Sequence, residues 1–535
     1  MPEILVEPGG RVIKAEKGVT LFEAIRAAGI SLTSPCGGQG ICRKCTIRLL
    51  SGRIDGEPVQ KDTYLACRSR VICNCEIIIP SISGEGQLQI LDDTRSGEFK
   101  LNPWIFRSGI IGEPADGQAA GIAVDLGTTT IVARLVSLGS GEILASTSTG
   151  NPQIKYGEDV ISRISYGSTE PGLAELSKIT TDCIGDLAVT LAEKETVPVE
   201  KILDIVVSGN STMSHILLGI SPSGLGVAPY EPPFRMHEPV LLRDAGLPGN
   251  ASGVLRILPN IAGFVGGDTV SGILSTGIHK RDEVSIFIDI GTNGEIVIGN
   301  KDRLITTSAA AGPAFEGGRI ECGMRAKTGA IDHVRITDDV TFTTIGEVPV
   351  PEGVCGTGVL EAVSEMLSAG VITGQGRLDV KDGHRKLAGN LAGRLDGSGG
   401  CAKFVLWSDG ESSVYVTQKD IAEIQLAKSA IRSSVEILLH EYGIGIDDVH
   451  EVLIAGAFGH YINIEDIFNI GLLPRIDINR VRIVGNTSIR GAMSLIRDSV
   501  AGEEADEIAG KAEFIEIAGR PEFQELFIEH IPFPV

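Results

Sequence analysis

Positive charge is scarce in this sequence, and so are long apolar runs. Lys and Arg number 47 against 69 Asp and Glu, which gives a net charge of −22 over 535 residues. A surface of this sign repels the phosphates of nucleic acids and of anionic membranes, so we expect neither as a partner. No uninterrupted apolar run is long enough to cross a bilayer, and the first residues lack the basic and apolar regions of a signal peptide. We therefore expect a cytoplasmic protein.

Cysteine is missing from most of the chain. Six of the ten cysteines lie between Cys36 and Cys75. Thiols stay reduced in the cytoplasm, which argues against a disulfide framework. The clustering instead predicts a metal site near the amino terminus. We assign no chemistry to the four isolated cysteines, which are Cys183, Cys322, Cys355 and Cys401.

The clustered cysteines have the spacing of an iron–sulfur loop. Cys36, Cys42 and Cys45 follow the pattern C-x5-C-x2-C, and Cys67 follows further along the chain. Glycines within the loop let backbone N–H groups approach the sulfides of a cluster. We predict that these four cysteines bind one [2Fe–2S] cluster. The alternative is a zinc site, but zinc favours paired C-x2-C knuckles and the sequence has one such pair.

Residues 1–80 have the element order of a β-grasp ferredoxin domain. Strands are predicted at 3–6 and 11–14, and Thr20 with Glu23 forms a capping box that opens a helix ending at Gly29. The cysteine loop and a final strand follow.

Two further cysteines, Cys73 and Cys75, alternate along that final strand. We expect both to be buried structural thiols rather than cluster ligands. Residues 81–118 contain scattered Gly, Ser, Asp and Pro with little periodicity, and we expect them to form a linker.

The rest of the chain alternates strands with helices and contains one internal repeat. Residues 121–130 and 285–294 align residue for residue, so that Asp125 matches Asp289. Each copy is an apolar strand that runs into Asp-x-Gly-Thr, which indicates a duplicated lobe. In such a hairpin the turn presents N–H groups and hydroxyls to a phosphate chain, and the aspartate can hold hydrated Mg²⁺.

Three further glycine-rich stretches fit a nucleotide site. Asp268 follows two glycines ahead of the second hairpin, and Gly356 lies where a glycine-rich segment opens a helix, a natural seat for an anion. A third stretch, at 453–459, is a strand that runs into a glycine turn.

Together these stretches resemble the two phosphate motifs and the adenosine motif of the superfamily of sugar kinases, acetate kinase, heat-shock chaperones and actin. The resemblance implies ATP as ligand and a catalytic role for Asp268, which alternatively is a structural cap. It also implies Mg²⁺ at Asp125 and Asp289. The implied phosphate contacts are Gly127, Thr128, Thr129, Thr130, Gly291, Thr292, Asn293, Gly294 and Gly356, and the implied nucleoside contacts are Gly456, Ala457 and Gly459.

A ferredoxin fused to an actin-like ATPase resembles the reductive activators of corrinoid-dependent methyltransferases and corrinoid iron–sulfur proteins. Stretches 151–163, 209–213 and 309–317 support the match. The resemblance implies a multidomain protein: an α+β β-grasp ferredoxin (1–80), the linker, then α/β, ribonuclease-H-like duplicated lobes divided into a middle domain (119–204) and a C-terminal ATPase domain (205–535).

The resemblance also implies an activity and partners. The protein would use ATP to transfer one electron from the cluster to inactive Co(II) in a corrinoid protein, which restores Co(I). It implies a low-potential electron donor and a homodimer. Three other readings remain open. They are an activator like that of 2-hydroxyacyl-CoA dehydratases, which lacks a ferredoxin domain, a small-molecule kinase with a redox-sensing domain, and a plain electron carrier.

Overall fold

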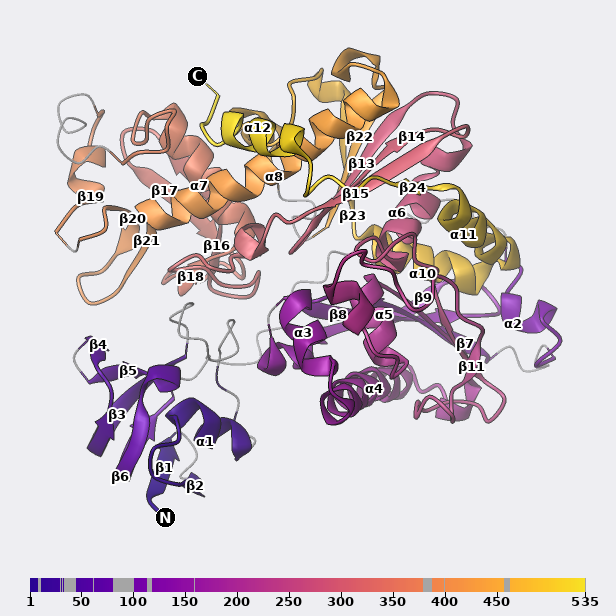
Figure 1. Cartoon of the computed structure of the whole chain (residues 1–535), viewed down its shortest axis with the longest axis horizontal. Helices are drawn as coiled ribbons and strands as arrows, with labels where there is room; N and C mark the ends of the chain where they lie inside the picture. Colours follow the sequence, from indigo (N-terminus) through magenta and orange to yellow (C-terminus); the bar gives the residue numbers. More distant parts are fainter. Residues whose placement is uncertain are drawn as a thin grey trace.

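The computed structural model describes residues 1–7, 11–28, 30, 32, 45–60, 62–79, 101–112, 118–157, 159–378, 387–398, 400–456 and 462–534. The described chain forms a small N-terminal domain and two larger lobes (Figure 1). Each of these three parts is built on a six-stranded sheet. Among the described residues, no helix has the length and apolar character needed to cross a membrane.

The N-terminal domain has the β-grasp arrangement predicted from the sequence. Its sheet has the order β2-β1-β6-β3-β5-β4, with β1 and β6 parallel. The capping box of Thr20 and Glu23 is present, and the helix that it opens buries Leu21 and Ile25 against the sheet. The elements are β1 (Glu3–Glu7), β2 (Arg11–Lys14), α1 (Leu21–Ala27), β3 (Thr46–Asp55), β4 (Pro58–Gln60), β5 (Thr63–Leu65), η1 (Ala66–Arg68) and β6 (Arg70–Ile78).

The expectation that Cys73 and Cys75 are both buried is wrong for Cys73. Cys75 is 6% exposed in the domain core, whereas Cys73 is exposed and its Sγ lies 3.3 Å from the Arg53 carbonyl oxygen. The cause is a shift of register between Gly52 and Ile54 in the β3–β6 ladder. The shift interrupts the period-two alternation on which the expectation depended.

Part of the segment expected to be a linker is anchored to the C-terminal helices. Residues 101–112 include α2 (Trp104–Arg107), whose Ile105 is fully buried. The Asn102 backbone N–H donates to the Arg497 carbonyl at 2.7 Å, and its side chain donates to the Ser499 hydroxyl at 2.7 Å. Composition alone missed this anchor because a single four-residue turn carries no periodic signal.

The first lobe contains a sheet of order β11-β12-β10-β7-β8-β9. Its strand β10 is parallel to β7 and spans residues 202–209, so the domain division expected between residues 204 and 205 cuts a strand of this lobe. The sheet continues to β12, which pairs with β10. The elements are β7 (Ala120–Leu126), β8 (Thr130–Ser137), β9 (Ile143–Gly150), η2 (Pro152–Tyr156), α3 (Val160–Gly167), α4 (Glu170–Lys194), β10 (Ile202–Gly209), α5 (Ser211–Leu217), β11 (Val240–Leu241) and β12 (Val254–Ile257).

The second lobe repeats this design with a sheet of order β23-β22-β13-β14-β15-β24. Two three-stranded sheets extend it. The elements are α6 (Gly267–Thr276), β13 (Ser285–Ile290), β14 (Gly294–Gly299), β15 (Leu304–Ala309), η6 (Pro313–Glu316), β16 (Ala330–Ile336), β17 (Val340–Thr344), β18 (Gly353–Val354), α7 (Gly356–Ser368), β19 (Leu395–Asp396), β20 (Lys403–Ser408), β21 (Ser413–Thr417), α8 (Gln418–Tyr442), β22 (Glu451–Gly456), α9 (Ile464–Asn469), β23 (Val481–Gly485), α10 (Thr487–Arg497), α11 (Ser499–Lys511), β24 (Glu513–Phe514) and α12 (Pro521–Glu529).

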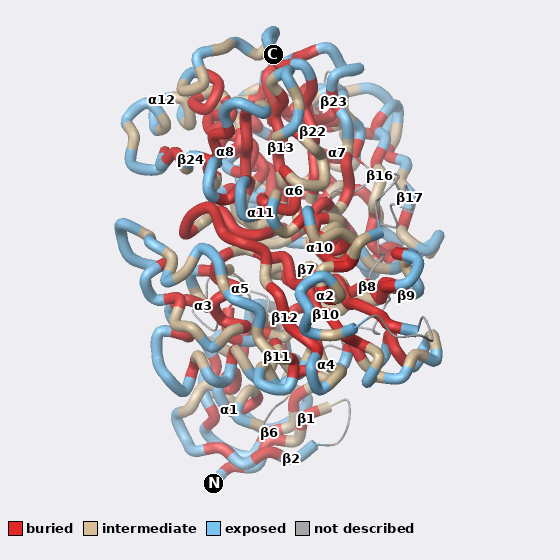
Figure 2. Tube along the Cα trace, turned by 90° about the vertical axis from the view of Figure 1, so that its right-hand side faces the viewer, coloured by how far each residue is buried: buried red, intermediate tan, exposed pale blue. Residues whose placement is uncertain are grey.

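Two helices, α6 and α10, lie between the sheets of the two lobes and join them. Their apolar side chains form one core with residues of both sheets, and Figure 2 shows this region buried. The packing is close: a Cβ on Gly272 of α6 would lie 2.2 Å from the Phe287 ring of β13, and one on Gly491 of α10 would lie 2.4 Å from Ser271. The two phosphate hairpins are therefore held by one shared core.

A buried ion pair ties the first lobe to both α2 and α10. Arg256 of β12 donates to both carboxylate oxygens of Asp204, at 3.0 and 2.6 Å, and to the Leu495 carbonyl at 2.9 Å. The guanidinium also lies 4.5 Å from the centre of the Trp104 ring. Asp204 is fully buried. Removing one partner of such a pair leaves an uncompensated buried charge.

We predict that Asp204→Ala lowers the free energy of unfolding of the lobes by about 3–5 kcal/mol. Chemical denaturation followed by circular dichroism measures the loss. A matched control is Lys178→Ala, which removes an exposed pair with Asp182 of 2.8 Å and should cost at most about 1 kcal/mol. Equal losses in the two variants would contradict the anchoring role of the buried pair.

Candidate functional site

The two repeated hairpins face one cavity of about 290 Å³ between the lobes. Most residues predicted for the nucleotide site line it. They are Asp125, Gly127, Thr128, Thr129 and Thr130 from the first hairpin, Asp289, Gly291, Thr292 and Asn293 from the second, and Asp268, Gly356 and Gly456 from elsewhere. The expected nucleoside contacts Ala457 and Gly459 lie outside the described residues.

One predicted phosphate contact, Gly294, does not line the cavity. The second hairpin turns through residues 291–293 between Ile290 and Gly294, whereas the first turns through 127–130 between Leu126 and Ile131. Because the second turn is one residue shorter, Gly294 already pairs with Ile290 of β13, whereas the equivalent Thr130 is not paired with β7, whose last pair is Leu126 with Ile131. A Cβ on it would lie 3.0 Å from Ile431 of α8.

The first phosphate loop is fixed through its own backbone carbonyls. Asn151 donates to the Gly127 carbonyl at 2.8 Å, and Arg163 donates to the Thr128 carbonyl at 2.6 Å. The Asn210 side-chain amide donates a hydrogen bond to the Thr128 hydroxyl at 3.0 Å. These three residues belong to the stretches 151–163 and 209–213, so both stretches serve to shape the loop. The Gly127 N–H closes the turn on the Thr130 carbonyl at 3.0 Å, and N–H groups in turns of this kind can face a phosphate.

Asp125 is held at the N-terminus of α10. Asn486, the N-cap of that helix, donates to Oδ2 at 2.7 Å, and Ser488 donates to Oδ1 at 2.7 Å. Burial raises the pKa of Asp125, while the Ser488 and Asn486 hydrogen bonds oppose that rise. Sequence reasoning missed these two residues. A strand that ends in Gly-Asn-Thr-Ser repeats the strand-to-polar-turn pattern of the phosphate hairpins and was the available signal.

The cavity gathers buried negative charge. Burial and the neighbouring carboxylates Asp268, Asp125 and Glu316 raise the pKa of Asp289 to about 8. Burial raises the pKa of Asp268 to about 6, with a further contribution from Asp125. Glu295 lies directly across the strand pair from Asp289, and burial holds its pKa well above the usual value. Arg134 and Arg325 also line the cavity and oppose the rise for Asp125 and Glu316, but burial still raises the pKa of these carboxyl groups.

Glu316 connects the two phosphate loops across the cleft. Its carboxylate accepts the Thr129 hydroxyl of the first lobe at 2.8 Å and the Thr292 hydroxyl of the second at 3.2 Å. Glu316 ends η6 in the stretch 309–317, which the sequence pointed out only by family resemblance. Burial raises the pKa of this carboxyl group, and the two threonine hydrogen bonds oppose the rise.

The donor set fits a hydrated divalent cation carried by a nucleotide. Within the described parts of the chain, no three Asp, Glu, His or Cys side chains converge closely enough to form a metal site alone. Mg²⁺ usually keeps several waters and binds through one or two carboxylates plus phosphates. The buried Thr487 hydroxyl, which lines the cavity and has no protein partner among the described residues, offers a further polar contact for a ligand.

Two positions in the wall of the cavity, Gly456 and Gly356, have no room for a side chain. Gly456, at the end of β22, has φ +102°, and a Cβ on it would lie 2.3 Å from the Ile290 carbonyl and 2.5 Å from Asp289 Oδ1. A Cβ on Gly356, the first residue of α7, would lie 1.7 Å from the Phe315 carbonyl. Helix α7 therefore begins at the cavity wall with its N–H groups available to an anion.

In the N-terminal domain, the structure brings two of the four predicted cluster ligands together. The Sγ atoms of Cys45 and Cys67 are 3.1 Å apart, Cys45 is buried, and the Ala66 N–H donates to the Cys45 carbonyl at 2.8 Å. Cys36 and Cys42 lie outside the described residues. Burial raises the pKa of the Cys75 thiol to about 11, which disfavours the thiolate that a cluster needs.

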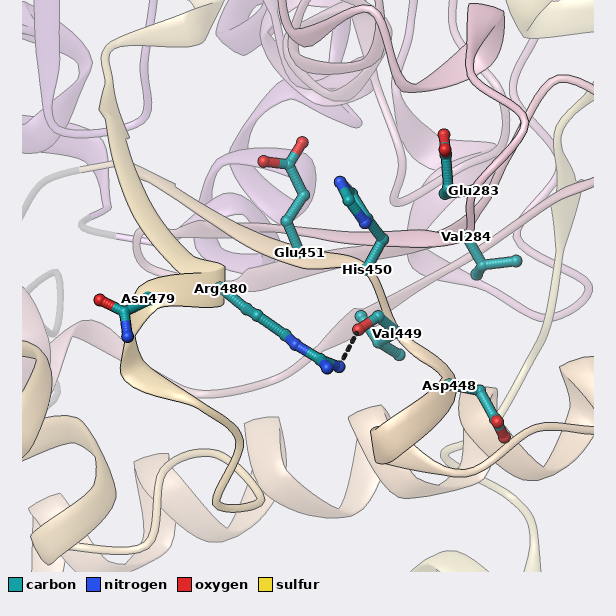
Figure 3. A pocket seen from close by; sticks show the side chains of 8 residues that line it. All are labelled: Glu283, Val284, Asp448, Val449, His450, Glu451, Asn479 and Arg480. Atoms are coloured by element: carbon teal, nitrogen blue, oxygen red, sulfur yellow. Dashed lines mark hydrogen bonds between the residues drawn. The ribbon is translucent and has the colours of Figure 1, made fainter.

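A second hollow, of about 610 Å³, lies at the opposite ends of β13, β22 and β23 from the phosphate loops. Figure 3 shows Arg480 reaching back to Val449, whose carbonyl it contacts at 3.1 Å. Glu451 pairs with Arg482 at 3.2 Å and with Arg281. Arg480 and Glu451 already have protein partners, and neither phosphate hairpin reaches this hollow. We therefore place the nucleotide site in the cavity between the lobes.

Comparison with known proteins covers nearly all of the chain. Residues 4–71 match the family "2Fe-2S iron-sulfur cluster binding domain", residues 120–281 match "RACo middle region", and residues 283–535 match "C-terminal domain of RACo the ASKHA domain". ASKHA domains are the actin-like ATPase fold, so the predicted fold class is confirmed.

Individual relatives agree with the family models. Corrinoid activation enzyme RamQ of Eubacterium limosum is 34% identical over 77% of this chain and 70% of its own length. The reductase of the Co(II) methylated amine-specific corrinoid protein of Methanosarcina barkeri is 29% identical over 47% of this chain and 46% of its own length. The solved structure of a reductive activator for a corrinoid, iron–sulfur protein is 31% identical, with a TM-score of 0.73 over 100% of this chain and 98% of that one.

We predict that Cys67→Ser abolishes or grossly alters the visible absorption and electron paramagnetic resonance spectra of a [2Fe–2S] cluster. The reason is that Cys67 lies beside Cys45 and would supply one thiolate ligand. Cys73→Ser is the matched control, because Cys73 is exposed on the neighbouring strand and should leave both spectra unchanged. A normal spectrum for Cys67→Ser would show that the fourth ligand lies elsewhere.

We predict that Glu316→Gln tightens ADP binding in the absence of Mg²⁺ by about tenfold, since removing roughly 1.4 kcal/mol of charge repulsion has that effect. Glutamine keeps the shape of the side chain and one acceptor for the threonine hydroxyls. Calorimetric titration with and without Mg²⁺ measures the change. Glu283→Gln makes the same chemical change at an exposed position outside the cavity and should have no effect. Equal affinities in the two variants would exclude a nucleotide-facing role for Glu316.

Proposed function

This chain belongs to the family of reductive activators of corrinoid proteins, and we propose that it uses ATP to transfer one electron from a [2Fe–2S] cluster to Co(II) in a corrinoid protein. The Co(I) product is the form that takes up a methyl group, so the activity restores a methyl-transfer system whose cobalt has been oxidised. The partner is a corrinoid iron–sulfur protein or the corrinoid component of a methyltransferase, and a low-potential donor reduces the cluster.

One observation carries the proposal: a single chain joins a cysteine site of ferredoxin type to a cavity formed by two phosphate hairpins. The Co(II)/Co(I) couple is more negative than an ordinary cluster, and a gap of ~300 mV costs about 7 kcal/mol for one electron. ATP supplies this free energy only if it acts differently on two conformational states. A plain electron carrier has no use for the second site.

The residues of the cavity divide the work of ATP hydrolysis. Asp125 and Asp289 would hold the waters of Mg²⁺, which neutralises the phosphates when bound. Asp268 lies in the first turn of α6 in the cavity wall, where a partly protonated carboxyl group can orient the attacking water. Glu316 would sense closure, because it reaches a hydroxyl on each lobe.

The rival activities predict different chemistry at the same cavity. A small-molecule kinase would transfer the γ-phosphoryl group to a hydroxyl or carboxyl acceptor, whereas the activator releases inorganic phosphate. An activator of the 2-hydroxyacyl-CoA dehydratase type has no ferredoxin domain, and residues 4–71 of this chain match one. We further propose that the protein is cytoplasmic and forms a homodimer. Sedimentation analysis of the purified protein tests the oligomeric state.

We predict that Asp289→Asn abolishes ATP-dependent formation of Co(I) while the cluster still reduces normally. Asparagine keeps the shape of the side chain but cannot hold Mg²⁺ through its waters as a carboxylate does. The variant also removes a carboxyl group that must either take up a proton or carry a repelled, buried charge when the protein folds, so it should raise the melting temperature of the nucleotide-free protein. The cobalt spectrum of a reduced mixture with the corrinoid partner, with and without ATP, measures the transfer.

Two results would contradict this proposal. Complete Co(I) formation by the wild-type protein without ATP would exclude an uphill mechanism. A lower melting temperature for Asp289→Asn would show that Asp289 supports the fold rather than the ligand.

A further inference from the structure

The ferredoxin domain contacts the first lobe through an arginine on α1. Arg26 lies in the last turn of that helix, and its guanidinium carbon is 4.8 Å from the ring centre of Tyr156 and 5.5 Å from that of Tyr166. Both tyrosines belong to the first lobe, at the end of η2 and in α3. Figures 1 and 2 both show α1 on the side of the ferredoxin domain nearest to α3.

The two tyrosines are arranged to receive a cation. Their ring centres are 4.7 Å apart, and both hydroxyls donate to Glu175 of α4, that of Tyr166 at 2.5 Å. These hydrogen bonds hold the pKa of Glu175 below its usual value, so the carboxylate stays charged close to the arginine. Tyr156 is 8% exposed. Two aromatic faces beside a carboxylate are the chemistry that recognises a guanidinium group.

The same segment holds the first phosphate loop. Tyr156 is the last residue of η2, and Asn151, the N-cap of that turn, donates to the Gly127 carbonyl at 2.8 Å. Arg163 donates to the carbonyl of Gly157, next to Tyr156, at 2.8 Å, and to the Thr128 carbonyl at 2.6 Å. A displacement of the loop therefore reaches the tyrosines through two short hydrogen-bonded paths.

We propose that Tyr156, Tyr166 and Glu175 form a docking seat for Arg26, through which the first lobe holds the chain's own ferredoxin domain, and that nucleotide binding at the first phosphate loop releases it. The occupant is the ferredoxin domain because its arginine reaches both rings. Lys155, which lies 4.9 Å from the Tyr156 ring centre, belongs to the first lobe itself. Nucleotide acts on the seat through the first phosphate loop, whose carbonyls Asn151 and Arg163 connect to the segment that carries Tyr156. This inference concerns the chain alone and needs no corrinoid partner.

A linked equilibrium of this kind acts in both directions. If nucleotide weakens docking by some factor, loss of docking must strengthen nucleotide binding by up to the same factor. Couplings of this type are usually between about 5-fold and 150-fold. A purely structural contact at Arg26 would change stability and leave nucleotide affinity as it was.

The test uses the full-length protein and two arginine variants. Arg26→Ala should tighten binding of magnesium-ADP at least about fivefold in calorimetric titration. It should also enlarge the particle in small-angle X-ray scattering whether or not nucleotide is present. The wild-type protein should enlarge only when nucleotide is added. Arg11→Ala removes an exposed arginine from the edge strand β2 of the same domain and should behave as the wild type does.

Variants on each side of the contact separate the seat from other roles. Glu175→Gln should reproduce the effects of Arg26→Ala, and the double variant should add little to either single change. Arg26→Lys keeps the charge without the planar group and should fall between wild type and Arg26→Ala. An unchanged cluster spectrum in each variant checks that the ferredoxin domain is folded.

Two outcomes would overturn the proposal. One is that Arg26→Ala and Arg11→Ala give the same nucleotide affinity and the same particle size. The other is that Arg26→Ala weakens only the binding of a corrinoid protein, which would make the tyrosine pair a partner contact. Neither outcome would affect the proposed ATP-dependent electron transfer, which is tested with Asp289→Asn.

Discussion

The rest of the structure depends on holding several acidic side chains close together at the ends of two strands. Asp125 and Asp289 end equivalent strands of two lobes, and Asp268, Glu295 and Glu316 line the same cavity. Carboxylates in a shared, poorly hydrated site repel one another by several kcal/mol per close pair, about 4 kcal/mol at 4 Å for an effective dielectric constant of 20. The fold can hold them only because the core around α6 and α10 fixes both hairpins.

Because of that repulsion, the acidic side chains of the cavity need different compensation depending on whether a cation is bound. Without a cation, the charges are reduced by proton uptake and by hydrogen bonds such as those from Asn486 and Ser488 to Asp125. When magnesium and a nucleotide bind as proposed, the cation would neutralise the carboxylates and the phosphates together. Glu316 is sensitive to the difference because its two threonine partners lie on opposite lobes.

Sequence alone predicted the parts of the site that are local patterns. The cysteine spacing and the repeated Asp-x-Gly-Thr hairpins are read within a few residues, and the hairpins meet as expected. Glu316 and Asn486 were missed because they reach the cavity from distant segments. The signals beside them are indirect: a family resemblance for Glu316 and, for Asn486, a strand that runs into a polar turn. The exposure of Cys73 and the withdrawal of Gly294 were missed for a different reason. A shifted register and a turn shorter by one residue change which way a side chain or strand end faces, without any sign in composition.

The docking seat can be controlled by nucleotide only if the free energy of docking is small. Each cation–π contact contributes about 0.5–1 kcal/mol at a partly exposed site, so two contribute about 1–2 kcal/mol. An equilibrium of that size favours the docked state by roughly 5- to 30-fold, within the range that a bound nucleotide can reverse. A large apolar interface would hold the ferredoxin domain permanently and separate its cluster from any partner. A tether with no seat would leave the domain free at all times, and hydrolysis would then have no control over when the electron leaves.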